Sequence, residues 1–322
     1  MSVHHDFIWS ILVHLGTNMW YEEGNDRGNS DGSGKTWKVG ACTDLRFDRA
    51  TWDAYLARMK KSGVNTIVLD IGEALAYESH PELAVNGSWT RAEMAAELVR
   101  LEKMDFEVIP KLNFSACHDT WMKDYSRMLS TPIYYQVCKD LINEVCEIFK
   151  PRYFHIGMDE EVYENQQFYD YVAIRQNDLW WHDLYYLVNC VEEHGARAMI
   201  WSDYARHRPD EFVEKCPKSV VQCVWYYFNE FGEKDLSPVC EVRVRPLDIL
   251  ERHGFDQLPT GSIEYYDENL RLLAEYCRDH ISKEHLLGFM QTTWIAVQPQ
   301  WQEMLDKSAD TVRDVREWYE SR

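Results

Sequence analysis

The chain is poor in positive charge. It contains 34 Lys and Arg residues against 54 Asp and Glu residues, which gives a formal net charge of −20. No stripe of Lys and Arg interrupts this negative balance, so the chain would repel nucleic acids and anionic membrane surfaces. Neither is expected as a partner.

Long hydrophobic runs are also missing. The run nearest the start, Phe7 to Leu15, is interrupted by His14 and is too short to span a bilayer. It lacks the basic flank and small-residue cleavage site of a secretory signal. The sequence therefore predicts no membrane association, and either a cytoplasmic protein or a mature chain whose signal has been removed.

The nine cysteines are odd in number and form no Cys-x-x-Cys pair. This spacing favours reduced, mostly buried thiols over a disulfide framework or a zinc knuckle. Hydrophobic residues make up 45% of the chain, which is typical of a globular protein and argues against disorder. Aromatic residues reach 14%, and those rings that are not needed in the core would suit a sugar-stacking cleft.

One unit recurs along the chain: a short apolar run, a polar loop and an amphipathic helical stretch. Eight such units predict a parallel sheet covered by helices, and their number fits a single closed (β/α)8 TIM barrel over residues 1–322. An open doubly wound sheet is the other architecture considered, but Leu15 to Tyr21 lacks the glycine fingerprint that it requires. The expected strands are Ile8 to His14, Thr66 to Ile71, Phe106 to Leu112, Tyr153 to Ile156, Arg197 to Trp201, Val220 to Trp225, Gln257 to Ile263 and Leu286 to Thr292.

Local signals mark the starts of several helices. Asp48 is expected to cap one helix, Thr90 and Glu93 to form a capping box on the next, and Thr131 to precede a third that begins at Pro132. Two longer helical stretches are expected before the fifth strand and at the end of the chain. They run from Leu179 to His194 and from Trp301 to Trp318.

A polar, glycine-rich insertion follows the first strand, at residues 22–35. Its end resembles a phosphate-binding loop, but Asn29 stands where that motif requires its first glycine, so we reject a nucleotide site. A loop at this place lies on the catalytic face of a barrel, where it is either a mobile lid or a surface loop without a role.

The active site of such a barrel lies at the carboxyl ends of its strands, and acidic residues crowd the predicted ends here. The sharpest signal is the segment from Phe154 to Glu161, in which a strand runs into glycine and then into three consecutive acids. Adjacent acids raise each other's pKa by like-charge repulsion, which keeps one of them protonated as a general acid. An acidic cap on the following helix is the alternative interpretation.

This segment resembles the strand-four motif His-x-Gly-Gly-Asp-Glu of the family-20 glycoside hydrolases, the β-N-acetylhexosaminidases. The matching residues of the motif are His155 to Glu160. Four further segments are similar to that family in the same order along the chain: Pro110 to His118, Trp201 to Asp203, Tyr265 to Asp267, and Gly288 to Trp294.

The resemblance implies an exo-acting, retaining β-N-acetylhexosaminidase with no cofactor or metal, in which the substrate's own 2-acetamido oxygen attacks the anomeric carbon. Asp159 would polarise the acetamido N–H, and Glu160 would act first as general acid and then as general base. Tyr266, or alternatively Tyr265, would hydrogen-bond the acetamido group. The full set of substrate-binding residues that the resemblance implies is His118, Trp201, Asp203, Trp225, Tyr266, Asp267 and Trp294.

The chain departs from the family pattern at three places. Met158 replaces the second glycine of the motif, Ile295 stands where an acid is expected, and the stretch from His14 to Asn18 lacks the arginine that grips sugar hydroxyls. An accessory domain usually precedes the barrel in that family, and we expect none in this sequence. These departures describe a divergent member and leave open which hexosamine it takes.

Two other functional classes stay open. A metal-dependent barrel isomerase or hydrolase would use Glu73, Asp159, Asp203 and Glu264 with a histidine, although neither a His-x-His nor a His-Glu-x-x-His motif supports it. A non-catalytic sugar-binding relative would keep the pocket and lack turnover. For a glycoside hydrolase and for a non-catalytic sugar-binding relative alike, the expected partner is a carbohydrate. The oligomeric state is left open between monomer and dimer.

Overall fold

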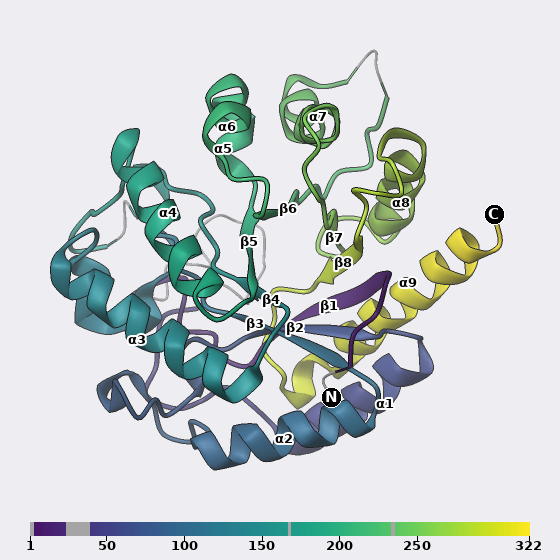
Figure 1. Ribbon diagram of the computed structural model, residues 1–322. Helices are drawn as coiled ribbons and strands as arrows, with labels where there is room; N and C mark the ends of the chain where they lie inside the picture. The colour runs from purple at the N-terminus through teal and green to yellow at the C-terminus, as the bar shows by residue number, and fades with distance from the viewer. Residues whose placement is uncertain (1–2, 24–38, 167–168, 233–235) are drawn as a thin grey trace.

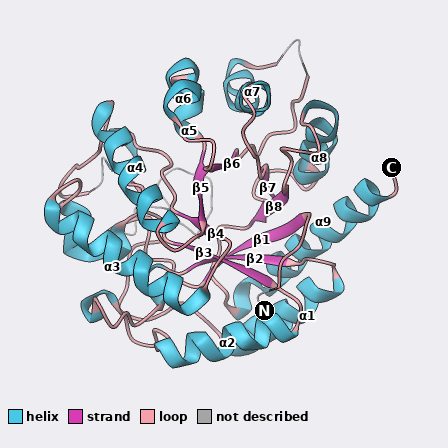
Figure 2. Ribbon diagram, in the orientation of Figure 1, coloured by secondary structure: helices cyan, strands magenta, loops and turns pink. Residues whose placement is uncertain are grey.

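The computed structural model describes residues 3–23, 39–166, 169–232 and 236–322. Eight parallel strands form the centre, and helices surround them (Figures 1 and 2). The strand order is β6-β5-β4-β3-β2-β1-β8-β7. Backbone hydrogen bonds from Leu258 N to Gln222 O and from Thr260 N to Val224 O, both 2.9 Å, join the two ends of this order. The fold is the (β/α)8 barrel that the sequence predicts.

The strands and helices follow the predicted alternation, with bounds that differ by a few residues. The strands are β1 (Ile8–His14), β2 (Thr66–Asp70), β3 (Glu107–Lys111), β4 (Tyr153–His155), β5 (Arg197–Trp201), β6 (Val221–Cys223), β7 (Thr260–Ser262) and β8 (Gly288–Thr292). The helices are α1 (Arg49–Lys61), α2 (Arg91–Lys103), α3 (Pro132–Phe149), α4 (Asp178–Glu192), α5 (Asp203–His207), α6 (Pro209–Lys215), α7 (Pro238–Arg252), α8 (Asn269–His280) and α9 (Gln302–Glu320). Short 3-10 helices lie at Gly72–Ala74, Pro81–Leu83, Thr120–Arg127, Tyr163–Gln166 and Pro299–Trp301.

The predicted helix starts are confirmed. Asp48 accepts a hydrogen bond from Thr51 N at 2.7 Å at the start of α1. Thr90 and Glu93 cap α2 reciprocally, since the side chain of each accepts from the backbone N–H of the other. The Thr131 hydroxyl accepts from the third residue of α3. These caps satisfy N–H groups that a helix end leaves without a partner.

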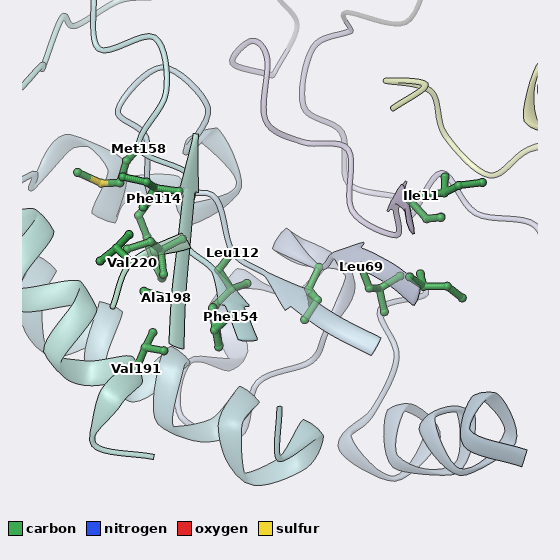
Figure 3. Packing of buried hydrophobic residues seen from close by; sticks show 14 of the residues in the cluster. Ile11, Leu69, Leu112, Phe114, Phe154, Met158, Val191, Ala198 and Val220 are labelled. Atoms are coloured by element: carbon green, nitrogen blue, oxygen red, sulfur yellow. The ribbon is translucent and has the colours of Figure 1, made fainter. Parts of the chain in front are cut away.

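Buried apolar side chains fill two layers. One lies between the strands and the surrounding helices and includes Ile11, Leu69, Phe154 and Ala198 of the strands and Val191 of α4 (Figure 3). The other fills the inside of the barrel, from Ile8, Leu12, Val68, Ile109, Met199 and Met290. Strand side chains alternate between these two layers. Because all the strands run in the same direction, the polar residues that follow them lie together at the carboxyl end of the barrel.

Other sequence expectations concern the thiols, the membrane and the insertion. All nine cysteines are free and eight of them are buried, as predicted. Within the described ranges, no helix has the length and apolar character needed to cross a bilayer. Residues 24–35 of the predicted insertion lie outside the described residues.

Candidate active site

Two consecutive carboxylates follow β4 and face one histidine. The Nε2 atom of His118 lies 3.1 Å from Glu160 Oε2 and 3.4 Å from Asp159 Oδ2. The Asn165 amide donates to the same Glu160 oxygen at 3.2 Å. His118 therefore links two acids that belong to a segment some forty residues further along the chain.

The Asp159 carboxylate is held from its other side by Asn113, which follows β3. The Asn113 side-chain amide donates to Asp159 Oδ1 at 3.2 Å, and its oxygen accepts from Ser115 N at 2.9 Å. The Ser115 hydroxyl in turn donates to the backbone oxygen of Asp159. The loops after β3 and β4 thus fix the orientation of this carboxylate together.

The backbone of the acidic segment is left-handed at three of four consecutive residues. The φ angles are +79° at Gly157, +74° at Met158 and +47° at Glu160. Side chains other than glycine rarely adopt such angles, and residues that do so cluster at functional sites. The motif that this segment resembles has a glycine at position 158, and the left-handed backbone found there is one that glycine adopts readily. The Met158 side chain is buried in the core.

The third acid of the run points elsewhere. Glu161 accepts from Ala116 N at 3.0 Å and from Arg175 Nε at 3.0 Å. Arg175 is fully buried and also pairs with Asp183 at 2.9 Å. Glu161 is therefore part of the ionic network that anchors the loop, and only Asp159 and Glu160 face the pocket.

Burial is the main electrostatic influence on Asp159. Desolvation raises its pKa to about 6; the charges of Asp203 and Glu160 act in the same direction, while His118 and Lys111 oppose them. Repulsion between the adjacent acids, which the sequence predicts as the cause of such a shift, raises the pKa of Asp159 less than burial does. Asp159 therefore changes charge close to neutral pH.

Lys111 belongs to a buried ionic group below the site. Its ammonium lies 2.5 Å from Asp70 Oδ2, and His14 Nδ1 lies 3.2 Å from the same oxygen. Burial raises the pKa of Asp70, but the Lys111 and His14 contacts outweigh it and lower that pKa to about 2. Asp70 thus stays ionised at the pH at which Asp159 titrates.

Aromatic rings wall the pocket that Asp159 and Glu160 face. Its volume is about 170 Å³, below the roughly 300–1,000 Å³ of clefts that hold drug-sized ligands. Trp294 lies 6.1 Å from Trp201 and 5.7 Å from Trp20, between ring centroids. Of the predicted residues, the lining includes Asp159, Glu160, His118, Trp201, Trp225 and Trp294.

Three predicted residues lie apart from this lining. Asp203 does not line the pocket but contacts a residue that does: its carboxylate accepts a hydrogen bond from Trp225 Nε1 at 2.8 Å and pairs with Arg206 at 3.0 Å. Tyr266 does not line the pocket and is 45% exposed, whereas its neighbour Tyr265 does line it.

Asp267 is the third of them. It is an exposed carboxylate that pairs with Lys307 at 2.5 Å on α9, outside the pocket.

Several residues that line the pocket were not predicted from the sequence. Tyr227 follows β6, and its hydroxyl accepts from Trp294 Nε1 at 3.2 Å. Arg243 lies on α7, where its guanidinium is 4.7 Å from the ring centroid of Trp225. The lining residues that received no role are Trp20, Tyr227, Phe228 and Arg243; Glu264 was considered only as a metal ligand. Only aromatic abundance near strand ends could have pointed to the first three, and no local signal marks Arg243.

The carboxylates considered for a metal site do not gather. Within the described ranges, no group of three or more His, Cys, Asp or Glu side chains is placed to hold a metal ion. Glu73 accepts from Thr17 N at 2.7 Å and from Asn18 N at 3.0 Å. It anchors the loop after β1 and borders a different hollow, of about 1370 Å³, that contains neither Asp159 nor Glu160.

Residues 105–237 match the model of glycosyl hydrolase family 20, catalytic domain, and this segment includes His118, Asp159 and Glu160. No curated protein sequence matches the chain.

Solved structures of the same family are similar in fold. The β-N-acetylhexosaminidase of Bacteroides fragilis is 12% identical with a TM-score of 0.63, over 96% of this chain and 66% of that one. The enzyme of Streptomyces coelicolor is 13% identical with a TM-score of 0.61, over 95% and 64%. A Vibrio harveyi exo-β-N-acetylglucosaminidase in complex with N-acetylglucosamine is 14% identical with a TM-score of 0.58, over 83% and 52%.

The chain thus spans roughly half to two thirds of the length of these structures. At such low identity the likeness concerns the fold, and the match over residues 105–237 connects the acidic segment with the family. Over residues 105–237 the chain is therefore similar to the catalytic domain of glycosyl hydrolase family 20, the family that its strand-four motif resembles, and its fold is the barrel of the solved structures.

Proposed function

We propose that the protein is an exo-acting β-N-acetylhexosaminidase that uses the substrate's 2-acetamido group as the nucleophile. The observation that carries the proposal is the pair Asp159 and Glu160, which share His118 and face a small aromatic pocket. The small volume supports binding of a terminal sugar residue. The family match and the N-acetylglucosamine in the Vibrio harveyi structure support the choice of sugar class.

In this proposal Asp159 acts on the acetamido group. Its ionised carboxylate accepts a hydrogen bond from the acetamido N–H, which makes the carbonyl oxygen a better nucleophile toward the anomeric carbon. The same negative charge stabilises the oxazolinium intermediate as positive charge develops. Asn113 and His118 fix the carboxylate in one orientation, so little reorganisation is needed when the substrate reacts.

Glu160 carries the proton transfers. In the first step it donates a proton to the glycosidic oxygen as the bond to the leaving group breaks. In the second step the ionised carboxylate takes a proton from water, which adds to the anomeric carbon and opens the oxazolinium ring. Trp201, Trp225 and Trp294 would pack on the sugar and exclude other water molecules from the intermediate.

The test is nitrophenol release from aryl N-acetyl-β-glucosaminide and its galactosamine epimer, beside the plain aryl β-glucoside. We expect turnover only where the acetamido group is present. Glu160→Gln should lower kcat on natural-type leaving groups by about 10²–10⁴-fold, and Asp159→Asn should lower kcat by about 10²–10³-fold. Glu268→Gln is the matched control, because it removes one carboxylate charge at an exposed position after β7.

Each outcome has a separate meaning. Turnover of the plain glucoside, or activity indifferent to both substitutions, would contradict the proposed mechanism. Binding of N-acetylglucosamine without hydrolysis of any substrate would instead identify a sugar-binding relative that has lost turnover.

A further inference from the structure

A second hollow adjoins the sugar pocket on the far side of Glu160. Its volume is about 620 Å³, and it lies between the loop after β4 and the helices α5 and α7. Glu160 and Arg243 line both hollows, whereas Asp159 lines only the first. The carboxylate assigned to proton transfer therefore stands at the boundary between two spaces.

This placement has a chemical meaning if the proposed function holds, on which the following inference rests. A general acid protonates the oxygen that joins the terminal sugar to its leaving group. It must therefore touch the terminal sugar's site on one side and the leaving group's site on the other. With the acetamido-binding Asp159 in the first hollow, the second hollow is left for the leaving group.

The second hollow is lined by arginines with unused hydrogen-bonding capacity. Arg206 has a side chain only 5% exposed, and it donates to Asp203 Oδ1 at 3.0 Å and to the backbone oxygen of Trp225 at 2.8 Å. Its buried Nε atom has no hydrogen-bond partner in the described part of the chain. Because this atom is enclosed by the protein, Arg206 would act on a ligand in the hollow through its charge.

Arg243 supplies a second positive charge. Its guanidinium lies 4.7 Å from the ring centroid of Trp225, and that of Arg206 lies 3.8 Å from the same centroid. Arg243 forms no hydrogen bond or ion pair with the residues that the structure describes. Burial lowers the pKa of Arg206, Asp203 raises it, and the charge of Arg243 lowers it again, as expected for two like charges held close together.

The charges that line the second hollow do not balance. Among the described residues of its lining, Arg175, Arg206, Arg208 and Arg243 contribute four positive charges, and Glu161, Glu164 and Asp203 contribute three negative charges. Glu160 is neutral when it is ready to donate its proton. One positive charge is therefore left uncompensated at the boundary of the second hollow before the reaction begins.

We propose that the second hollow is the leaving-group subsite and that it selects an acidic leaving saccharide, of the hexuronate type. Arg243 binds the carboxylate, and the buried positive charge of Arg206 beside it adds to the attraction. A planar guanidinium with free donors on an aromatic face suits a carboxylate, which it can bind with two parallel hydrogen bonds. The net charge of −20 disfavours long polyanions, so the substrate class is a short acidic oligosaccharide.

The test compares two disaccharides with the same linkage, in which β-linked N-acetylglucosamine is joined to glucuronate or to glucose. For the native protein we expect kcat/KM to favour the glucuronate compound by about tenfold. The preference should shrink as salt is raised, because ions screen the contact. In Arg243→Gln the ratio of the two kcat/KM values should fall to about one. Arg245→Gln is the matched control, since it removes the same charge from an exposed position on the same helix.

The outcomes separate this inference from the function on which it rests. Equal kcat/KM values for the two compounds in the native protein would overturn the inference and leave the proposed function intact. If neither compound is hydrolysed, the aryl glycosides of both epimers decide the proposed function, and calorimetric titration with the glucuronate disaccharide decides the inference alone. Binding that is lost in Arg243→Gln and kept in Arg245→Gln supports it, and absence of binding to the native protein overturns it. The titration and the salt series on the native protein also serve if Arg243→Gln does not fold.

Discussion

Replacing Gly157 with alanine should damage the site through Asn113. Gly157 has φ of +79°, and a Cβ atom added to it would overlap the Asn113 side-chain oxygen and lie 2.6 Å from its Cγ and 3.0 Å from its Cα. The Asn113 side chain would have to leave its place. It would then lose its hydrogen bonds to Asp159 Oδ1 and from Ser115 N.

The size of the effect follows from two contributions. An alanine in the left-handed region costs about 1–2 kcal/mol relative to glycine. Loss of partners for buried polar groups costs about 1–3 kcal/mol more. Gly157→Ala should therefore lower the free energy of unfolding by about 2–5 kcal/mol.

Gly195→Ala provides the control for the backbone contribution. Gly195 has φ of +75°, and a Cβ atom there would meet no atom within 4 Å. Urea denaturation of both variants should give a loss of about 1–2 kcal/mol for Gly195→Ala and a larger loss for Gly157→Ala. Equal losses in the two variants would refute the argument, because they would mean that Asn113 does not have to move.

Two further predictions concern charge. Since burial raises the pKa of Asp159 to about 6 and the proposed mechanism needs its ionised form, kcat/KM should fall about tenfold per pH unit below that value. The residual activity of Asp159→Asn should not show this fall in kcat/KM at low pH. If the fall persists unchanged in the variant, it is caused by the titration of another group. Arg175→Met should lower the free energy of unfolding by about 3–5 kcal/mol in urea, because it leaves Glu161 and Asp183 buried without their cation. The control Arg313→Met, whose ion pairs are partly exposed, should cost at most about 1 kcal/mol.

The parts of the fold that depend on residues close together in the sequence could be predicted from it. The Asp48 cap and the Thr90–Glu93 box are local patterns, and both are found where they were expected. The alternation of apolar runs and helices predicted a parallel sheet, because parallel strands require crossover connections. The number of these units, eight, then favoured a closed barrel. The acids that leave the barrel after β4 could also be predicted, since strand ends define the catalytic face.

Contacts made across the fold could not be predicted in the same way. Arg243 lies in the second turn of a helix, where nothing in the local sequence distinguishes it from Arg245 on the same helix. The choice between Tyr265 and Tyr266 depends on the conformation of the turn that follows β7, which no local pattern in the sequence specifies. Asp267 follows them and is turned toward Lys307 instead of the pocket.

The most direct test of the proposed mechanism is the rate of hydrolysis of aryl N-acyl-β-glucosaminides in which the acetyl group carries none, one, two or three fluorine atoms. Fluorine withdraws electrons from the carbonyl oxygen and makes it a weaker nucleophile. If that oxygen attacks the anomeric carbon with the help of Asp159, kcat/KM should fall steeply with each added fluorine. A rate that does not depend on fluorination would contradict the mechanism and would require a different nucleophile.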